Sequence, residues 1–381
     1  MTKTVNICDV CNEIFAGGDA PKNNMSQAPN ERHSIPIFSN GEENEGLYGY
    51  TDKARVTQPS ITVSARGTIG YTAIRNTPFV PIVRLITLIP NPELIDINYL
   101  YYAVRNYKFD GSGTSIPQLT VPSIKKYSFP LPTKEEQKRI ALLLDNLCEL
   151  IEKRKKQLAK LDELVKARFV EMFGDPISNP KGLPVKTLKQ LSTLITNGNT
   201  PKGGSENYVD EGILFLRSQN VWRNRIELED VAYIDEATHR SLKKSSLKYK
   251  DILITKTGRI NTENSSLGRA ALFLGEDNSA NINGHVYLIR LNGSVIPEYV
   301  ISILTSESYR NYIRKVCVGG IDKRQINLDQ VEEFPIIIPA IELQNQFAAF
   351  VKQVDKSKVA VQKALDEAQT LFDSLMQQYF G

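Results

Sequence analysis

The sequence predicts an α+β protein built from two repeats, each a globular domain of mixed α/β structure followed by one long helix. Three observations predict this fold class. Two stretches carry apolar residues at heptad spacing, the pattern of helices that pack along their length. Residues 325–381 align with residues 118–174 at a constant offset of 207 positions. The segments that precede the two stretches contain β-rich runs broken by glycine-containing turns.

The first long helix is predicted over 133–173, which contains neither Pro nor Gly. Pro132 before it and Gly174-Asp175-Pro176 after it are start and stop signals. At about 1.5 Å per residue, roughly 38 helical residues span about 57 Å, a length that suits a spacer. Arg154 and Arg168 occupy two positions of its heptad seam, either as partner contacts or as surface turns. The apolar seam residues are Ile140, Leu144, Leu147, Ile151, Leu158, Leu161, Val165 and Met172.

The second long helix is predicted over 340–381. Gln137 pairs with Gln344 and Phe173 with Phe380 at the same offset, and Lys358 takes the position of Ile151. Two equivalent helices with equivalent seams most simply pack on each other. The second seam comprises Phe347, Val351, Val354, Val361, Leu365, Ala368, Phe372, Leu375 and Tyr379.

Composition narrows the class of protein. A chain of 381 residues fits two or three domains, and no apolar run reaches the roughly 18 residues of a transmembrane helix. The start of the sequence has no signal-peptide pattern, and four cysteines fit a reducing compartment such as the cytoplasm. A net charge of +4 permits an anionic partner without demanding one.

The first globular domain is predicted over 1–132. Its expected elements are a short helix or strand over 5–15, a strand followed by a turn and loop from Ile35, a hairpin over 61–74, a β-rich run over 79–89, a helix over 96–106, a flexible loop over 111–114 and a terminal strand over 121–132. The second domain, 184–339, follows a linker over 174–183 and repeats this plan. Both domains share a Gly-x-x-Pro-Lys step, Gly18–Lys22 and Gly198–Lys202. The helix over 298–314 is expected to match that over 96–106.

Motifs for catalysis are scarce. The phosphate-binding pattern G-x-x-x-x-G-K-[ST] is absent from the sequence, and the glycines at 17 and 18 are interpreted as a turn. Cys8-x-x-Cys11 is half of a zinc site and is interpreted as two buried thiols. The three histidines are dispersed. We therefore expect a non-catalytic protein with no cofactor or metal of its own.

Basic and amide side chains in predicted loops favour nucleic acid. The stretch 217–225 combines three Arg, amides and one Trp without an acid. Arg, Asn and Gln pair with base edges, and Lys and Arg with phosphates. The second-domain candidates are Lys202, Arg217, Gln219, Asn220, Trp222, Arg223, Arg225, Lys256, Thr257, Arg259, Lys323 and Arg324. The first-domain candidates are Lys22, Asn23, Tyr48, Tyr50, Arg66, Thr68 and Tyr71.

Several phrases resemble the specificity subunits of type I restriction–modification systems. They are Phe129–Pro132, the EEQKRI stretch at 135–140, and the run 150–176 that ends in Met172-Phe173-Gly174-Asp175-Pro176. The resemblance covers essentially the whole chain.

The resemblance implies that each globular half is a target recognition domain for one half of a bipartite double-stranded DNA site. It further implies that the long helices pair as an antiparallel coiled coil that sets the half-site spacing. Two modification subunits that methylate adenine N6 and carry S-adenosylmethionine would dock on this chain, restriction subunits can join, and no membrane is involved.

Two other interpretations stay open at this point. The chain could be a coiled-coil scaffold whose globular domains bind protein, in which case DNA binding would not depend on Arg217, Arg223 and Arg225. It could also be a self-sufficient methyltransferase, which would require the isolated chain to bind S-adenosylmethionine.

Overall fold

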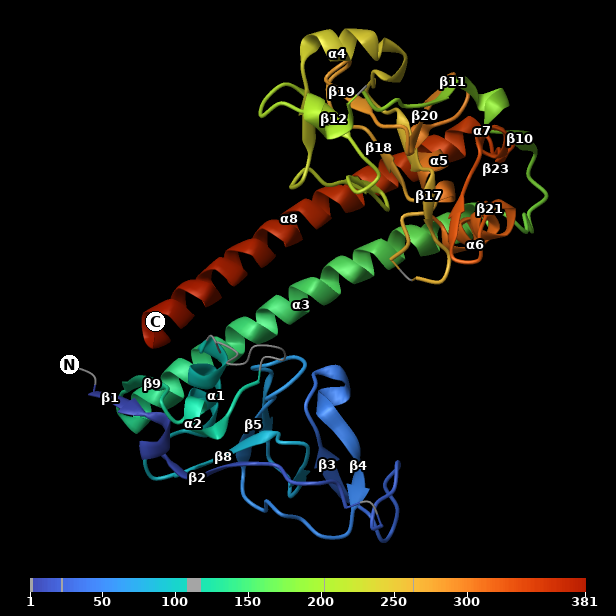
Figure 1. Cartoon of the computed structure of the whole chain (residues 1–381). Coiled ribbons are helices and arrows are strands. Elements are labelled where there is room, and N and C mark those ends of the chain that lie inside the picture. Colours follow the sequence, from blue (N-terminus) through green and yellow to red (C-terminus); the bar gives the residue numbers. More distant parts are fainter. Residues whose placement is uncertain (1–2, 22, 108–117, 202, 263) are drawn as a thin grey trace. The chain divides into compact units, whose positions relative to one another are not determined.

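The computed structural model describes residues 3–21, 23–107, 118–201, 203–262 and 264–381 (Figure 1). The chain divides into two compact units. The first comprises Met1–Lys156 and Gln362–Gly381, and the second Gln157–Val361. Each unit therefore holds one globular domain, part of helix α3 (Lys134–Phe173) and part of helix α8 (Ile341–Phe380).

The first domain is built on two small sheets. A four-stranded sheet has the order β2-β8-β5-β6, and a three-stranded sheet has the order β4-β3-β7, in which β3 and β7 run parallel. Strand β1 pairs with β9 just before α3. The strands are β1 (Lys3–Asn6), β2 (Cys11–Ala16), β3 (Ile35–Phe38), β4 (Leu47–Thr51), β5 (Ser60–Val63), β6 (Thr72–Arg75), β7 (Val80–Pro81), β8 (Ile86–Pro90) and β9 (Ser128–Leu131).

Two helices complete the first domain. Helix α1 (Ile97–Asn106) lies against β5 and β6, and the Asp96 side chain caps it by accepting hydrogen bonds from two backbone N–H groups of its first turn. Helix α2 (Val121–Ile124) is a single turn. The core of this unit contains Ile61, Leu88 and Tyr99 from the domain together with Leu144 of α3 and Phe372 of α8.

The second domain repeats these sheets. Its four-stranded sheet has the order β11-β20-β16-β18, its three-stranded sheet the order β15-β12-β19 with β12 parallel to β19, and β10 pairs with β23. The strands are β10 (Val185–Thr187), β11 (Ser192–Asn197), β12 (Ile213–Leu216), β15 (Ala232–Ile234), β16 (Ile252–Thr255), β18 (Ala270–Leu272), β19 (Ala280–Ile282), β20 (Val286–Leu291) and β23 (Pro335–Ile337).

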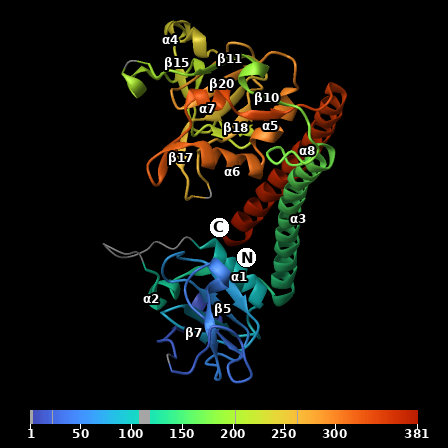
Figure 2. The same cartoon turned by 90° about the vertical axis from the view of Figure 1, so that its right-hand side faces the viewer.

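The second domain contains further elements. A hairpin pairs β13 (Val221–Trp222) with β14 (Arg225–Ile226), and a small sheet joins β17 (Thr257–Arg259), β22 (Lys323–Gln325) and β21 (Val318–Gly319). Helix α5 lies against β18, as Figure 2 shows. The helices are α4 (Glu236–Ser241), α5 (Pro297–Leu304), α6 (Glu307–Val316) and α7 (Leu328–Glu332).

The structure confirms the hairpin over 61–74 and the helix over 96–106, and it corrects other element predictions. Segment 121–132 is not all strand, because Pro122 fits the first turn of α2 and only β9 is extended. Segment 298–314 holds two helices, since Ser306 starts α6 by capping it. Residues 47–51 form a strand rather than loop, and segment 5–15 forms strands on either side of one 3-10 turn. The loop predicted at 111–114 lies outside the described residues.

The two long helices run antiparallel, which confirms the predicted fold class. In the first unit the beginning of α3, including Ile140 and Leu147, shares a core with Ala368 and Phe372 near the end of α8. In the second unit Phe169 near the end of α3 shares a core with Phe347 and Val351 near the beginning of α8.

Each heptad seam shifts by one residue at its end. Sequence spacing predicted Met172, Leu375 and Tyr379 as seam residues, but these are half-buried. Phe173 and Phe380, one position further on, are buried instead and lie beside the aromatic rings of Tyr299 and Tyr99 at centroid distances of 4.9 and 5.0 Å. The last turn of each helix therefore packs into the core of a globular domain.

Charged residues in the seam make different contacts. Lys358 of α8 forms an ion pair with Asp162 of α3, so it links the two helices within the second unit. Arg168 pairs with Glu171 on its own helix, and its guanidinium lies 6.0 Å from the Phe350 ring centre of α8. Each of these charged side chains thus has a carboxylate partner, which offsets the cost of placing a cation at the edge of the apolar seam.

A buried glutamine fixes the start of each long helix to its domain. Gln137 and Gln344 are each only 1% exposed. The Gln137 Oε1 accepts a hydrogen bond from the Asp96 backbone N–H at 2.7 Å, and its Nε2 donates to the Pro132 carbonyl. The Gln344 amide makes the same two bonds, from the Ile296 N–H and to the Pro339 carbonyl. Both ends of each amide are therefore satisfied inside the protein.

We expect the substitution Gln344→Leu to lower the free energy of unfolding by about 1–3 kcal/mol, because it leaves the Ile296 N–H and the Pro339 carbonyl without these bonds. Gln346→Leu is the matched control, since Gln346 lies on the same helix and is exposed. Thermal unfolding of both variants tests this. Equal melting temperatures would contradict a structural role for the amide.

Candidate nucleic-acid interface

Three segments meet at the same edge of the four-stranded sheet in each domain. Counted in sheet order, the first segment is the glycine loop that follows the first strand. The second is the turn that leads into the second strand, and the third is the loop that follows the third strand. In the first domain these are the loop after β2, the turn 82–85 before β8, and the loop after β5. In the second domain they are the loop after β11, the turn 283–286 before β20, and the loop after β16.

Backbone hydrogen bonds hold the first-domain segments together. Gly17 N–H donates to the Leu85 carbonyl at 2.9 Å, and Arg84 N–H donates to the Gly17 carbonyl at 3.0 Å. The Asn40 side chain links the turn to the third segment, because its Nδ2 donates to the Val83 carbonyl and its Oδ1 accepts from the Ala65 N–H. The three segments therefore form one rigid rim.

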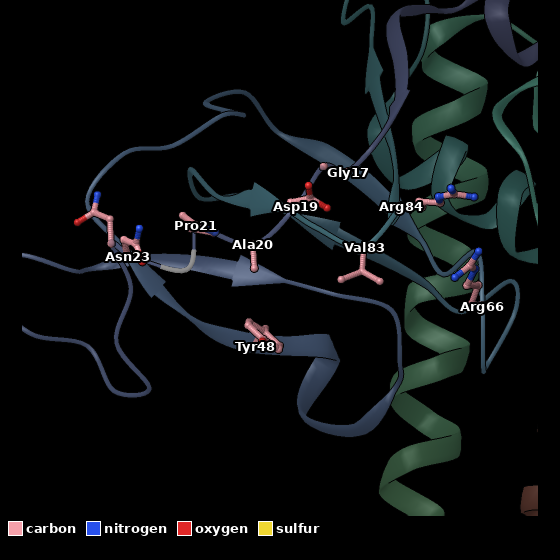
Figure 3. Close-up of a pocket in the computed structure, with 11 residues that line it drawn as sticks. Gly17, Asp19, Ala20, Pro21, Asn23, Tyr48, Arg66, Val83 and Arg84 are labelled. Carbon is pink, nitrogen blue, oxygen red and sulfur yellow. The ribbon is translucent and has the colours of Figure 1, made fainter.

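An open groove of about 920 Å³ lies along this rim (Figure 3). Arg66 and Arg84 lie at one end of the groove and Asn23 at the other, with Tyr48 between them. Gln118 Oε1 accepts hydrogen bonds from Arg66 Nε at 3.1 Å and Nη2 at 2.8 Å. The groove thus offers guanidinium, amide and phenol groups, the donors and acceptors that contact nucleic acid.

The turn that carries Arg84 is conformationally strained. Val83 and Arg84 have φ angles of 52° and 63°, in the left-handed region that β-branched residues rarely enter. The Leu85 N–H closes the turn on the Ile82 carbonyl, and the Val83 N–H donates to the Gly18 carbonyl at 2.7 Å. Strain of this kind persists only where the surroundings hold it, and it is concentrated at functional sites.

The second domain has the same arrangement with different side chains. Gly198 N–H donates to the Val286 carbonyl, and the Val286 N–H closes the turn on the Asn283 carbonyl. The Lys256 N–H donates to the His285 carbonyl at 2.8 Å, which brings the loop after β16 onto the turn. This register makes Gly17, rather than the Gly18 of the shared sequence step, the structural equivalent of Gly198.

Cations also gather around Trp222 in the second domain. The Arg269 guanidinium lies 3.8 Å from the Trp222 ring centre and that of Arg225 5.3 Å. Burial lowers the pKa of Arg269, and the nearby charge of Arg223 lowers it further. Arg269 is buried and donates from Nε to the Ser265 carbonyl at 3.0 Å, whereas Arg223 and Arg225 are exposed, so these two are the cations of the cluster that can reach a phosphate.

The structure brings only some of the predicted residues together. Asn23, Tyr48 and Arg66 line the first-domain groove. Thr68 lies in the exposed loop after β5, and Tyr50 lies on β4, where its backbone pairs with Ser26. Burial and the Glu45 carboxylate raise the pKa of Tyr71, so this phenol faces negative charge. Lys22 and Lys202 lie outside the described residues.

The stretch 217–225 is less cationic in the fold than in sequence. Arg217 and Gln219 both donate to the Asp230 carboxylate, and the Gln219 bond heads the interactions that lower the pKa of Asp230. Arg225 forms an ion pair with Glu227 at 2.7 Å. Glu227 and Asp230 follow the stretch in sequence, and the β13–β14 hairpin brings their carboxylates next to its cations.

Asn220 is a correction to the predicted interface. Its side chain is 2% exposed, its Oδ1 accepts from the Arg217 N–H, and its Nδ2 donates to the carbonyls of Glu227 and Asp230. This amide is committed to its own loop, so we remove Asn220 from the candidate interface.

The remaining predicted residues lie on the small sheet of β17, β22 and β21 and on the loop before it. Thr257 pairs with Gln325, and Arg259 forms an ion pair with Asp322 at 3.3 Å. Lys323 is exposed, Arg324 donates from Nε to the Gly320 carbonyl, and the Lys256 ammonium lies 5.8 Å from the Tyr287 ring centre.

The sequence prediction did not include Arg84, which lines the groove, and it gave His285 no role. Two adjacent left-handed residues are usually signalled by Asn-Gly, and Val83-Arg84 lacks that signal.

The cysteine interpretation was also wrong for Cys8, which is exposed, whereas burial raises the pKa of Cys11 to about 12. Within the described parts of the chain, the structure has no group of three potential metal ligands and no helix suited to spanning a membrane.

Comparison with known proteins assigns these domains to a family. The family model described as type I restriction modification DNA specificity domain matches residues 2–162 and 180–368. The chain belongs to this family. Two copies of the family domain thus cover both globular parts.

Relatives agree with this assignment. A Mycoplasma pneumoniae protein named as a type I specificity subunit is 38% identical over 39% of this chain and 48% of its own length. The chain thus spans about half the length of that relative. The type I restriction enzyme MjaIX specificity subunit of Methanocaldococcus jannaschii is 25% identical over 95% of this chain and 86% of its own length. The solved S subunit from M. genitalium shares the fold, with a TM-score of 0.61, 17% identity and coverage of 100% and 96% of the two chains.

We expect Val83→Asn to raise the free energy of unfolding by roughly 1 kcal/mol, because Asn tolerates a positive φ better than a β-branched residue. Val185→Asn is the control, since Val185 is similarly exposed but lies in a strand. Denaturant titration compares the two. A loss of stability in Val83→Asn would show that the strain is not located in this turn.

Proposed function

We propose that this chain is the DNA-recognition subunit of a type I restriction–modification complex and that each domain reads one half of a bipartite double-stranded DNA target. The observation that carries the proposal is the duplicated three-segment edge. Each copy joins the same three segments by backbone hydrogen bonds and presents different side chains, as expected when two domains read different sequences. The chain itself performs no chemistry in this proposal and needs no cofactor of its own.

The contacts divide into two classes. In the first domain, Arg66 and Tyr48 contact the DNA backbone at the groove while Asn23 faces base edges. In the second domain, the backbone contacts come from the basic side chains Lys256, Arg259, Lys323, Arg223 and Arg225. Phosphate contacts set the register of a protein on DNA, and base contacts specify the sequence.

The long helices act as the spacer and as the docking surface. We propose that the antiparallel coiled coil sets the gap between half-sites. Exposed apolar side chains of α3 would bind the modification subunits, expected to be two, and restriction subunits can join the same complex in the cytoplasm. These side chains are Leu142, Leu143, Leu150, Leu164 and Val170.

Co-expression with a modification subunit of the same system should produce methyladenine at a split motif with a fixed gap, mapped by long-read sequencing of host DNA. Omission of this chain should abolish that methylation, since the modification subunit then has no specificity partner. A stable complex that methylates no split motif would contradict the proposal.

The double substitution Arg223→Ala and Arg225→Ala should weaken DNA binding and flatten its dependence on salt concentration. Each lost phosphate contact reduces the slope of log K against log salt by about 0.9. The matched control is Lys160→Ala with Lys166→Ala, which removes the same charge from exposed positions of α3. Equal slopes for both double variants would exclude the Trp222 hairpin from the interface.

A further inference from the structure

We infer that one turn in each domain selects a base, with Arg84 in the first domain and His285 in the second as specificity-determining residues. The inference rests on the proposed function and goes beyond it. It names a single structural position at which the two domains encode different half-sites.

The two turns are equivalent by their hydrogen bonds. Ile82 N–H donates to the Phe38 carbonyl at 2.9 Å, and Asn283 N–H donates to the Leu216 carbonyl at 3.0 Å. Each turn therefore follows the parallel strand of the three-stranded sheet, β7 or β19. Each also leads directly into the four-stranded sheet through β8 or β20. Arg84 and His285 each occupy the third position of their turn, although only the first turn has a left-handed backbone.

In each turn the outer two residues are buried, so only the central side chains can differ without disturbing the packing. Ile82 and Leu85 are buried in the first domain, and Asn283 and Val286 in the second. The glycine loop presses against the residues that enter the turn. A Cβ on Gly17 would lie 2.6 Å from the Pro81 backbone, and one on Gly198 would meet the Ile282 carbonyl even more closely. The frame is thus constrained, whereas Arg84 and His285 are exposed.

The two central residues of each turn differ between the domains. The first carries Val83-Arg84 and the second Gly284-His285. Hydrogen bonds to the carbonyls of Gly17 and Gly18 hold the first turn in its left-handed conformation. The Arg84 side chain therefore projects from a rigid backbone. A rigid base for the side chain reduces the ordering cost of a base contact.

A basic residue of the third segment adjoins each turn. Arg66 shares one end of the groove with Arg84 (Figure 3). Lys256 is joined to His285 through its backbone N–H. This pairing assigns Arg66 and Lys256 to phosphates and the turn residues to base edges.

The chemistry of the two side chains predicts what each reads. An arginine on a fixed backbone can donate two parallel hydrogen bonds to the O6 and N7 atoms of guanine in the major groove. A neutral or charged imidazole N–H can donate one bond to a purine N7. We therefore assign a guanine to Arg84 in one half-site and a purine to His285 in the other.

The test uses the complex of the full chain with its modification subunit and a DNA library randomised in both half-sites. Methylated molecules are sequenced for the wild type, Arg84→Ala, Arg84→Lys and His285→Ala. Arg32→Ala is the control, because Arg32 is an exposed arginine of the first domain away from the groove lining.

Arg84→Ala should reduce the preference for guanine at one position of one half-site by about tenfold to a hundredfold and leave the other half-site unchanged. Arg84→Lys should lose the same preference while keeping the salt dependence of binding, since the charge remains but the two-pronged contact does not. His285→Ala should relax one position of the opposite half-site, and Arg32→Ala should change neither.

Unchanged motifs in Arg84→Ala and His285→Ala, beside a wild type that methylates a split site, would overturn the inference and leave the proposed function intact. The same is true if both substitutions alter one half-site. A wild-type complex that methylates no split site refutes the proposed function itself, and with it the inference.

Discussion

The burial of one amide side chain at the start of each long helix constrains the rest of the structure. Gln137 and Gln344 can satisfy both of their hydrogen-bonding ends only if the helix meets its domain in one orientation. The other end of each helix is equally constrained, because Phe173 and Phe380 each pack against a buried tyrosine. Each globular domain is therefore fixed to the beginning of one long helix and to the end of the other.

The two domains combine a common frame with different surfaces. Sheet order, the parallel strand pair, the glycine loop and the hydrogen bond that closes the turn are found in both, although only the first turn is left-handed. The side chains that differ are those that the frame leaves exposed, such as Arg84 and His285. Family membership accounts for the frame. The exposed side chains of the turns can differ between the copies without loss of the buried packing that holds the frame.

The sequence predicts the parts of this fold that depend on repetition and period. The heptad seams and the offset between copies predict both long helices within one or two residues. The candidate site is less predictable. The pairing of Arg217 with Asp230 depends on a hairpin that brings later residues back. The exposed position of Arg84 depends on a strained turn without a sequence signal. Groove residues such as Asn23 and Arg66 were found because loops beside strand ends are predictable.

The proposed function requires that each of the two domains reads one half-site. The most direct measurement replaces residues 1–132 with a second copy of residues 184–339 and maps the methylation motif of the resulting complex. The account predicts an inverted repeat of the half-site read by the second domain, with the gap of the natural motif retained. A folded complex that still methylates an asymmetric motif would contradict it.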